Sequence, residues 1–377
     1  YTDTTYFGAI VIKKNGPLVL LPLGTEKQVQ WCMSGGNSNS KETNISKLYR
    51  SRITSKQTNA PVFTGDSLYN LIWKPLMPQL KGVKIVSFAP DGLLHKVAFA
   101  ALPLSANALL LDSFQLQQYS SVRQLATQKN ATAALGTAVL QGYANFDAGS
   151  AAGSSGAWQT LPGTKQEIEA LQLLLKSKGL KVTVDTGMQA TEEAFKKLNG
   201  KAPAILHIAT HGFFLPDPPA GNAADISQSA VFGQNSFARS QDPLMRSGIV
   251  MSGANKYWSG VSVAGSKDDG ILTAYEIAQT NLQGTQLAVL SACETGLGDV
   301  QDSEGVFGLQ RALKMAGVKN MLLSLWQVPD AETMELMQLF YTQLLQGATP
   351  RKAFYQAQQT MRAKYPPFSW AAFVLME

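Results

Sequence analysis

Cysteine and histidine are scarce in this sequence: its 377 residues include two cysteines, Cys32 and Cys293, and three histidines. Two cysteines in a chain of this length do not form a disulfide framework, and we expect both to be free thiols in a reducing cytoplasm. A thiol must be reduced to act as a nucleophile, so this environment is compatible with cysteine chemistry. Very few residue pairs could join a thiol to an imidazole base.

Long apolar runs are also missing. No uninterrupted apolar segment approaches the roughly 18 residues that a membrane-spanning helix needs. The first six residues are polar and do not resemble a signal peptide. We therefore expect a cytoplasmic protein with no membrane partner. Because the chain lacks an initiator methionine, we expect it to be part of a longer protein or a processed form.

Concentrated positive charge is absent although the formal net charge is +6. The basic residues are scattered, with short pairs such as Lys13-Lys14 and Lys196-Lys197, and no basic stripe alternates with aromatic residues. This pattern is typical of a mildly basic, solvated surface. We expect no direct binding of nucleic acid by this segment.

Several motifs of familiar enzyme classes are missing as well. A serine hydrolase of the α/β type would need a Gly-x-Ser-x-Gly elbow, which does not occur. The segments 163–165 and 265–267 lack the glycine spacing of a phosphate-binding loop. A zinc site built from His207, His211 and Cys293 would lack the usual ligand spacing and a fourth ligand. We expect neither a metal nor another cofactor.

The sequence does contain strands that alternate regularly with helices, a pattern typical of an α/β fold with a mostly parallel sheet covered on both faces. The length favours two units, which we place at residues 1–130 and 131–377. A long loop rich in Gly, Ser, Asn and Pro is predicted at about 215–269. Strands are predicted near 84–88, 107–118, 138–143, 180–184, 206–211, 286–292, 320–326 and 370–376, and we expect the strand at 84–88 to be buried.

Local turn and cap residues support this division. Residues 6–12 and 18–22 predict a β-hairpin around Asn15-Gly16. A helix is predicted to start at Asp66, another after Thr191, and a third at Thr349-Pro350. Further helices are predicted at 164–178, 273–279, 303–316 and from Asp330 onward.

Two apolar runs end in a reactive side chain followed closely by glycine. Residues 206–212 end in His211-Gly212, and residues 290–296 contain Cys293. Because ligands bind beyond the carboxyl ends of parallel strands, neighbouring strands would bring imidazole and thiol together there. His211 would be the base and Cys293 the nucleophile. The backbone N–H groups of Gly212 and Cys293 could form an oxyanion hole.

Each of these residues also has an ordinary structural interpretation. Cys293 could simply be buried, because cysteine is among the most buried residue types. His211 could be a hydrogen-bonded turn histidine. His207 lies deeper in the apolar run, and we interpret it as a hydrogen-bonded core histidine. Asp330 opens a helix, where it could be the N-cap, and also follows a strand, where it could contact a substrate.

Taken together, these segments resemble the CHAT domain, a caspase-like module of cysteine peptidases related to separases and usually accompanied by tetratricopeptide repeats. The resemblance implies a caspase-like three-layer sandwich over residues 131–377, preceded by a degenerate, non-catalytic caspase-like half in residues 1–130. The residues that carry it are 88–95, 206–212, 290–296, 304–305, 325–330 and 370–375.

The resemblance further implies a cysteine endopeptidase that cleaves a specific protein partner through a thioester acyl-enzyme, with His211 and Cys293 as its dyad. The matching aspartate of separases holds a substrate arginine, so Asp330 would favour a basic side chain. The caspase signature Gln-Ala-Cys-x-Gly is not met, so strict aspartate specificity is not implied. No residue that orients His211 is apparent.

The resemblance also implies regulation, for example in bacterial defence or other regulated proteolysis. An attached helical-repeat region or an activating partner would act on the domain. We expect the 215–269 segment to be an activation or self-cleavage loop. Two alternatives remain open: a catalytically silent scaffold for protein–protein interaction, and a cysteine hydrolase of a small amide.

Overall fold

The computed structural model describes most of the chain. Cys293 lies outside the described residues, as do residues 216–236, 238–239 and 259–267 of the predicted loop. The described residues are 4–34, 48–49, 65–127, 135–149, 157–215, 237, 240–258, 268–291 and 304–377, without the side chains of 304–307.

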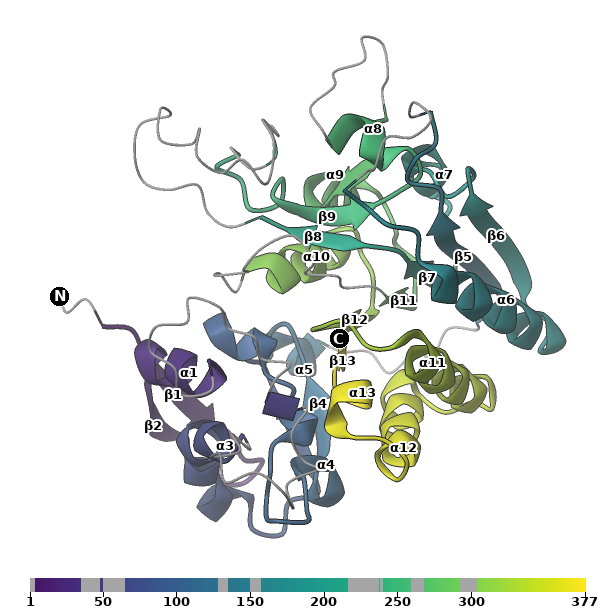
Figure 1. Cartoon of the computed structure of the whole chain (residues 1–377). Coiled ribbons are helices and arrows are strands. Elements are labelled where there is room, and N and C mark those ends of the chain that lie inside the picture. Colours follow the sequence, from purple (N-terminus) through teal and green to yellow (C-terminus); the bar gives the residue numbers. More distant parts are fainter. Residues whose placement is uncertain are drawn as a thin grey trace, which may run out of the picture.

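A large, mostly parallel sheet forms the centre of the molecule. Neighbouring strands are parallel except for one antiparallel pair, residues 320–324 with 373–376. In the described part of the chain the sheet has eight strands, in the order β3 (Ile85–Phe88), β4 (Gln115–Gln118), β13 (Phe373–Met376), β12 (Asn320–Ser324), β11 (Leu287–Leu290), β7 (Ile205–Ala209), β5 (Thr137–Ala144) and β6 (Lys181–Gly187) (Figure 1).

Helices cover both faces of this sheet and so produce the three layers that the sequence predicts. Side chains alternate across a strand: on β7, Ile205 belongs to one hydrophobic core and Leu206 to the other. The first core packs against α6 (Pro162–Ser177), α11 (Asp330–Leu345) and α12 (Pro350–Arg362), and the second against α7 (Glu192–Lys196), α9 (Ala274–Gln279) and α10 (Glu304–Met315).

Local signals for helix starts are confirmed at two predicted sites. The Thr191 hydroxyl accepts a hydrogen bond from the backbone N–H of Ala194 at the start of α7. Thr349 caps α12 through the N–H of Lys352, and Pro350 occupies the first helical position. Both contacts satisfy backbone donors that the first helical turn would otherwise leave unpaired.

The predicted loop at 215–269 is wrong in part, because it contains regular structure. Strand β9 (Ser247–Val250) pairs antiparallel with β8 (Gly212–Phe214) and with β10 (Ile271–Thr273), and α8 (Ala254–Trp258) follows. All four residues of β9 are buried. A strand this short among turn residues shows no clear periodicity in sequence, and it is stabilised by neighbours distant along the chain.

The N-terminal part begins with the predicted hairpin, now β1 (Tyr6–Val11) and β2 (Val19–Thr25), which pair antiparallel. Helix α1 (Glu26–Met33) follows. The remaining helical segments are α3 (Asp66–Ile72), η1 (Lys74–Leu80), η2 (Gly92–Lys96), η3 (Phe99–Ala101), α4 (Leu110–Ser113) and α5 (Arg123–Thr127).

Three strand predictions need correction. The 107–118 region holds one short helix, α4, before β4 begins at Gln115. Strand β3 was expected to be buried, but it lies at the edge of the sheet and Ile85 is 53% exposed. Trp370, predicted as the start of the last strand, belongs to α13 (Pro367–Trp370), because Pro367 at the first helical position favours a helix start.

The N-terminal part joins the rest of the molecule through the central sheet. Strand β4 pairs with β13 at Gln118 and Met376, and the Glu377 N–H bonds the Gln118 carbonyl. One hydrophobic core also contains residues from both sides of this seam. The boundary placed near residue 130 lies outside the described residues. No helix in the described part of the chain is long and apolar enough to span a membrane.

Candidate active site

His211 lies at the carboxyl end of β7, as predicted, in the short connection to β8. Its backbone carbonyl accepts a 2.8 Å hydrogen bond from the N–H of Val250 in β9. The neighbouring Thr210 hydroxyl donates to the Val250 carbonyl. Strand β9, which sequence patterns did not indicate, therefore fixes the backbone that carries His211.

The imidazole of His211 is held in one orientation. Its Nε2 atom lies 2.7 Å from the backbone carbonyl oxygen of Gln159. A carbonyl oxygen can only accept, so Nε2 carries the proton and Nδ1 is the basic nitrogen of the neutral ring. The rings of Phe146 and Trp158 pack against the imidazole, with centroids 5.1 and 5.3 Å away.

Gln159 is thus the orienting group that the sequence did not reveal. The contact uses its backbone carbonyl, which every residue type possesses, and it lies 52 positions from His211. No residue-type signal could have identified it. The aromatic neighbours Phe146 and Trp158 are likewise buried residues with no motif around them.

The end of strand β11 lies directly beside that of β7. Leu290 is in register with Ile208, and the N–H of Ser291 bonds the Ile208 carbonyl at 2.9 Å. Ser291 and His211 line one pocket of about 490 Å3, which we call the His211 pocket. Its other walls come from the starts of α6 and α11 and from the end of β12, and include Leu161, Gly163, Thr164, Ser324 and Asp330.

Asp330 faces the His211 pocket, but it is not the N-cap of α11. Pro329 occupies that position, and Asp330 is the first helical residue. A Cβ atom at Gly163 would overlap the Asp330 carboxylate, so this carboxylate lies directly against the start of α6. The starts of α6 and α11, which carry partial positive charge as helix N-termini do, both lie beside this carboxylate.

A chain of buried polar groups lies at the base of the pocket. Ser291 Oγ donates a 2.7 Å hydrogen bond to Oε1 of Glu167 on α6, and the same oxygen lies 3.1 Å from His207 Nε2. His207 Nδ1 in turn lies 3.1 Å from the hydroxyl of Tyr341. The interpretation of His207 as a hydrogen-bonded core histidine is confirmed. Burial, together with the charge of Glu167, raises the pKa of Tyr341.

Glu167 was not predicted as a site residue, although the sequence contains a signal for it. The buried positions of α6 include Thr164, Ile168, Leu171 and Leu175, and Glu167 falls on the same stripe. A carboxylate on the apolar stripe of a helix needs a buried partner, because an unpaired buried charge is costly.

A family model described as CHAT domain matches residues 63–377, which include the described walls of the His211 pocket. The chain belongs to the CHAT domain family. This CHAT domain is also 27% identical over 303 residues to tetratricopeptide repeat protein 28 of Homo sapiens and to that of Mus musculus. The alignments cover 76% of this chain and 12% of each relative, so the chain spans a small part of their length.

Solved structures similar to this CHAT domain include two of 11% sequence identity. The Saccharomyces cerevisiae separase–securin complex matches with a TM-score of 0.40, over 75% of this chain and 14% of that chain. The Arg-specific cysteine proteinase gingipain R matches with a TM-score of 0.48, over 81% of this chain and 67% of that chain.

The other scarce residues of the CHAT domain lie apart from the His211 pocket. Cys32 is buried in the hydrophobic core beside the N-terminal hairpin, and burial raises its thiol pKa. His95 is buried in η2, where burial lowers its pKa. Among the described residues, no group of three or more His, Cys, Asp or Glu side chains is arranged to hold a metal ion.

Proposed function

We propose that this CHAT domain is a cysteine endopeptidase in which His211 is the base and Cys293 the nucleophile. One observation carries the proposal: His211 presents an oriented imidazole, basic at Nδ1, at the end of β7. This strand lies next to β11, the strand that leads to Cys293. A catalytic base needs this combination of fixed ring, defined tautomer and open pocket.

Chain geometry supports Cys293 as the partner. Ser291 lines the His211 pocket, and its backbone is tied to Ile208 of β7. Cys293 is two residues further along, and two residues of chain span at most about 7 Å. This short span supports Cys293 as the proposed nucleophile rather than Cys32, which belongs to the core beside the N-terminal hairpin.

The proposed reaction begins when Nδ1 of His211 takes the proton of the Cys293 thiol. The thiolate attacks the peptide carbonyl, and the backbone N–H groups of Gly212 and Cys293 stabilise the oxyanion. The imidazolium then protonates the leaving amine, which leaves a thioester. His211 next removes a proton from water, which hydrolyses the thioester and restores the thiol. The Gln159 carbonyl holds the ring throughout.

Asp330 supplies a proposed basis for specificity. Its carboxylate lies on the wall of the pocket that His211 and Ser291 also line. A guanidinium or ammonium group entering this pocket would meet a carboxylate in a partly desolvated position, where charge pairing is stronger than in bulk water. We therefore propose that the cleaved substrate bond follows an arginine or lysine.

The proposed context is a larger regulated protein in the cytoplasm. The curated relatives are named for tetratricopeptide repeats and are far longer than this chain. We propose that a helical-repeat region or another protein partner controls access to the His211 pocket. Residues 215–269 remain the proposed activation segment; within them, β9 contacts the backbone of His211 directly.

The test is labelling by a peptidyl acyloxymethyl ketone with arginine at the reactive end, followed by peptide mapping. Label is expected on Cys293 in the unaltered chain and in Cys32→Ala, and it should disappear in Cys293→Ala and His211→Ala. The Cys32→Ala variant is the matched thiol control. Rapid labelling of His211→Ala would contradict the role of the base. Cys293 that alkylates no faster than Cys32 would favour a catalytically silent scaffold.

A further inference from the structure

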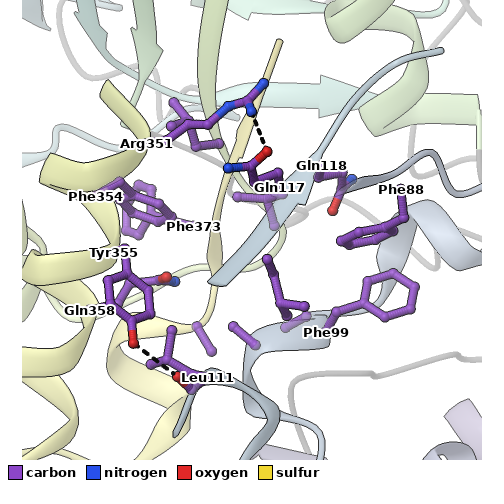
Figure 2. A pocket seen from close by; sticks show the side chains of 16 residues that line it. Phe88, Phe99, Leu111, Gln117, Gln118, Arg351, Phe354, Tyr355, Gln358 and Phe373 are labelled. Carbon is purple, nitrogen blue, oxygen red and sulfur yellow. Dashed lines mark hydrogen bonds between the residues drawn. The ribbon is translucent and has the colours of Figure 1, made fainter. Parts of the chain in front are cut away.

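A second pocket lies at the seam between the N-terminal part and the rest of the molecule (Figure 2). We call it the seam pocket. Strands β3 and β4 and the η3 segment line one side, and α12 and β13 line the other. Its aromatic lining residues are Phe88, Phe99, Phe354, Tyr355 and Phe373.

Two buried amides supply polarity within these apolar walls. Gln118 on β4 is 7% exposed and Gln358 on α12 is 5% exposed, and both line the seam pocket (Figure 2). Among the described residues the structure shows no hydrogen bond for either side-chain amide, and both amides line the pocket. An amide that lines a pocket and has no protein partner is available to bond an occupant of that pocket. Each offers donors and an acceptor, so an occupant with a similar group would satisfy them.

The cation at the pocket is already neutralised. Arg351 forms an ion pair with Glu377 and donates to Oε1 of Gln117 at 2.6 Å. Its guanidinium also lies over the ring of Tyr119, 4.3 Å from the centroid. Because the Arg351 guanidinium already pairs with Glu377 and donates to Gln117, it does not need an anionic ligand to balance its charge. An unpaired charge would be unfavourable against the aromatic walls, so the expected occupant is uncharged.

Polar contacts across the seam fix the shape of the pocket. Gln359 Nε2 donates to the Leu111 carbonyl at 3.0 Å. The Tyr355 hydroxyl contacts the same oxygen at 3.5 Å (Figure 2). Together with the contact between Arg351 and Gln117, these bonds hold α12 against β4 and the segment that precedes it. The pocket is therefore preformed, which lowers the entropic cost of binding.

We propose that the seam pocket binds a small, uncharged molecule with an aromatic body and one carboxamide or equivalent donor–acceptor pair. The aromatic body packs between the phenylalanines, and the amide bonds the side chains of Gln118 and Gln358. Such a molecule would touch Phe373, which also lines the His211 pocket. The proposal concerns binding alone and does not depend on peptidase activity.

The probe is N-benzylacetamide, titrated against the intact chain by ligand-observed NMR. Saturable binding in about the millimolar range is expected, because a ligand of this size gains modest affinity even in a good site. Protonated benzylamine, which has a similar ring but carries a charge, should bind at least about tenfold more weakly. No saturable binding of N-benzylacetamide would overturn the proposal, as would equal binding of benzylamine.

Variants locate the site. Gln118→Leu and Gln358→Leu keep much of the side-chain volume but remove the amide, so each should weaken N-benzylacetamide about tenfold. Ala100→Trp should fill the pocket and abolish binding. Gln346→Leu is the matched control: it makes the same substitution at an exposed position outside the pocket and should bind as the unaltered chain does. Unchanged affinity in both pocket glutamine variants would overturn the proposal.

Folding of these variants is checked by thermal melting. Replacing an unpartnered buried amide by an apolar group of similar volume should leave the melting temperature unchanged or raise it. A sharp loss of stability in both Gln118→Leu and Gln358→Leu would show that the amides already have partners, and it would overturn the proposal in the same way as failed binding.

Discussion

Ser291 Oγ donates a hydrogen bond of 2.7 Å to Oε1 of Glu167, and both residues are buried. This bond joins the end of β11, two residues before Cys293, to the helix that begins beside Asp330. The same carboxylate oxygen lies 3.1 Å from His207 Nε2. One buried side chain therefore supports both strands that end at the His211 pocket.

We predict that Glu167→Ala lowers the free energy of unfolding by about 2–4 kcal/mol, because it leaves Ser291 and His207 without their buried partner. Urea denaturation measures the change. Glu169→Ala is the matched control, because Glu169 is exposed on the same helix, and it should cost less than about 0.5 kcal/mol. Equal effects of the two substitutions would show that the buried contacts contribute nothing measurable.

Gly163→Ala tests the close approach of Asp330 to α6. Alanine ordinarily stabilises a helix relative to glycine, but here its Cβ would overlap the Asp330 carboxylate. We expect a cost of about 1–3 kcal/mol in the free energy of unfolding. In an Asp330→Gly background every Asp330 side-chain atom that a Cβ at position 163 would overlap is absent, including the Asp330 Cβ, and the same substitution should be neutral or stabilising.

The two single variants and the double variant form a double-mutant cycle. We predict a coupling free energy of at least about 1 kcal/mol between positions 163 and 330 in the free energy of unfolding. Gly136→Ala, where a Cβ meets nothing within 4 Å, serves as the control and should couple to neither position. Additive effects of Gly163→Ala and Asp330→Gly would mean that the Asp330 side chain does not lie against Gly163.

Asp330→Asn tests the proposed preference for a basic side chain. The substitution removes the charge but keeps the shape beside Gly163. Labelling of Cys293 by an arginine-ending acyloxymethyl ketone should slow by about 10- to 100-fold, whereas a leucine-ending reagent should be affected by no more than about twofold. If leucine- or methionine-ending reagents react faster than arginine-ending ones with the unaltered chain, the role assigned to Asp330 is wrong.

The raised pKa of Glu192 leads us to predict that the stability of the protein depends on pH. Burial raises its pKa from 4.5 to about 7, although Lys196, 2.8 Å from its carboxylate, opposes the shift. Between about pH 4.5 and 7 the folded state keeps a proton that the unfolded state has lost. The free energy of unfolding should therefore fall as pH rises through this window, by on the order of 2–3 kcal/mol, and level off above it.

Urea denaturation of Glu192→Gln across the same pH range checks this prediction. The glutamine does not titrate, so the fall assigned to Glu192 should be absent. Glu193→Gln is the control: Glu193 is exposed and pairs with Lys197 at the surface, and its loss should leave the slope unchanged. An identical slope in the unaltered chain and in Glu192→Gln would rule out Glu192 as the titrating group.

The features that sequence patterns predicted correctly depend on residues close together in the chain. The hairpin at Asn15-Gly16 and the caps at Thr191 and Thr349 use contacts within a few positions. The three-layer α/β fold follows from alternating strand and helix patterns. Strand β9 was missed because it is short, and its position depends on β8 and β10, which lie far away in sequence.

The sequence also placed His211 correctly, because an apolar strand that ends in a polar side chain and glycine is a local pattern. No residue pattern indicates its orienting contact with Gln159, because that contact is made by a backbone carbonyl. The sequence predicted correctly that a helix starts at Asp330, but in the structure Pro329 is the N-cap and Asp330 is the first helical residue. The contact of Asp330 with Gly163 depends on the packing of α11 against α6, which has no local signal.

By itself, the sequence determined the α/β class, the helix and strand periodicities, the resemblance to the CHAT family, and the scarcity of thiols and imidazoles that directs attention to His211 and Cys293. Tertiary structure alone decided which nitrogen of His211 is basic, the buried contacts of Glu167 with Ser291 and His207, and the glutamine-lined seam pocket. The physical reason is that these features arise from backbone groups and side chains tens to hundreds of residues apart, whose approach is set by packing and leaves no local pattern.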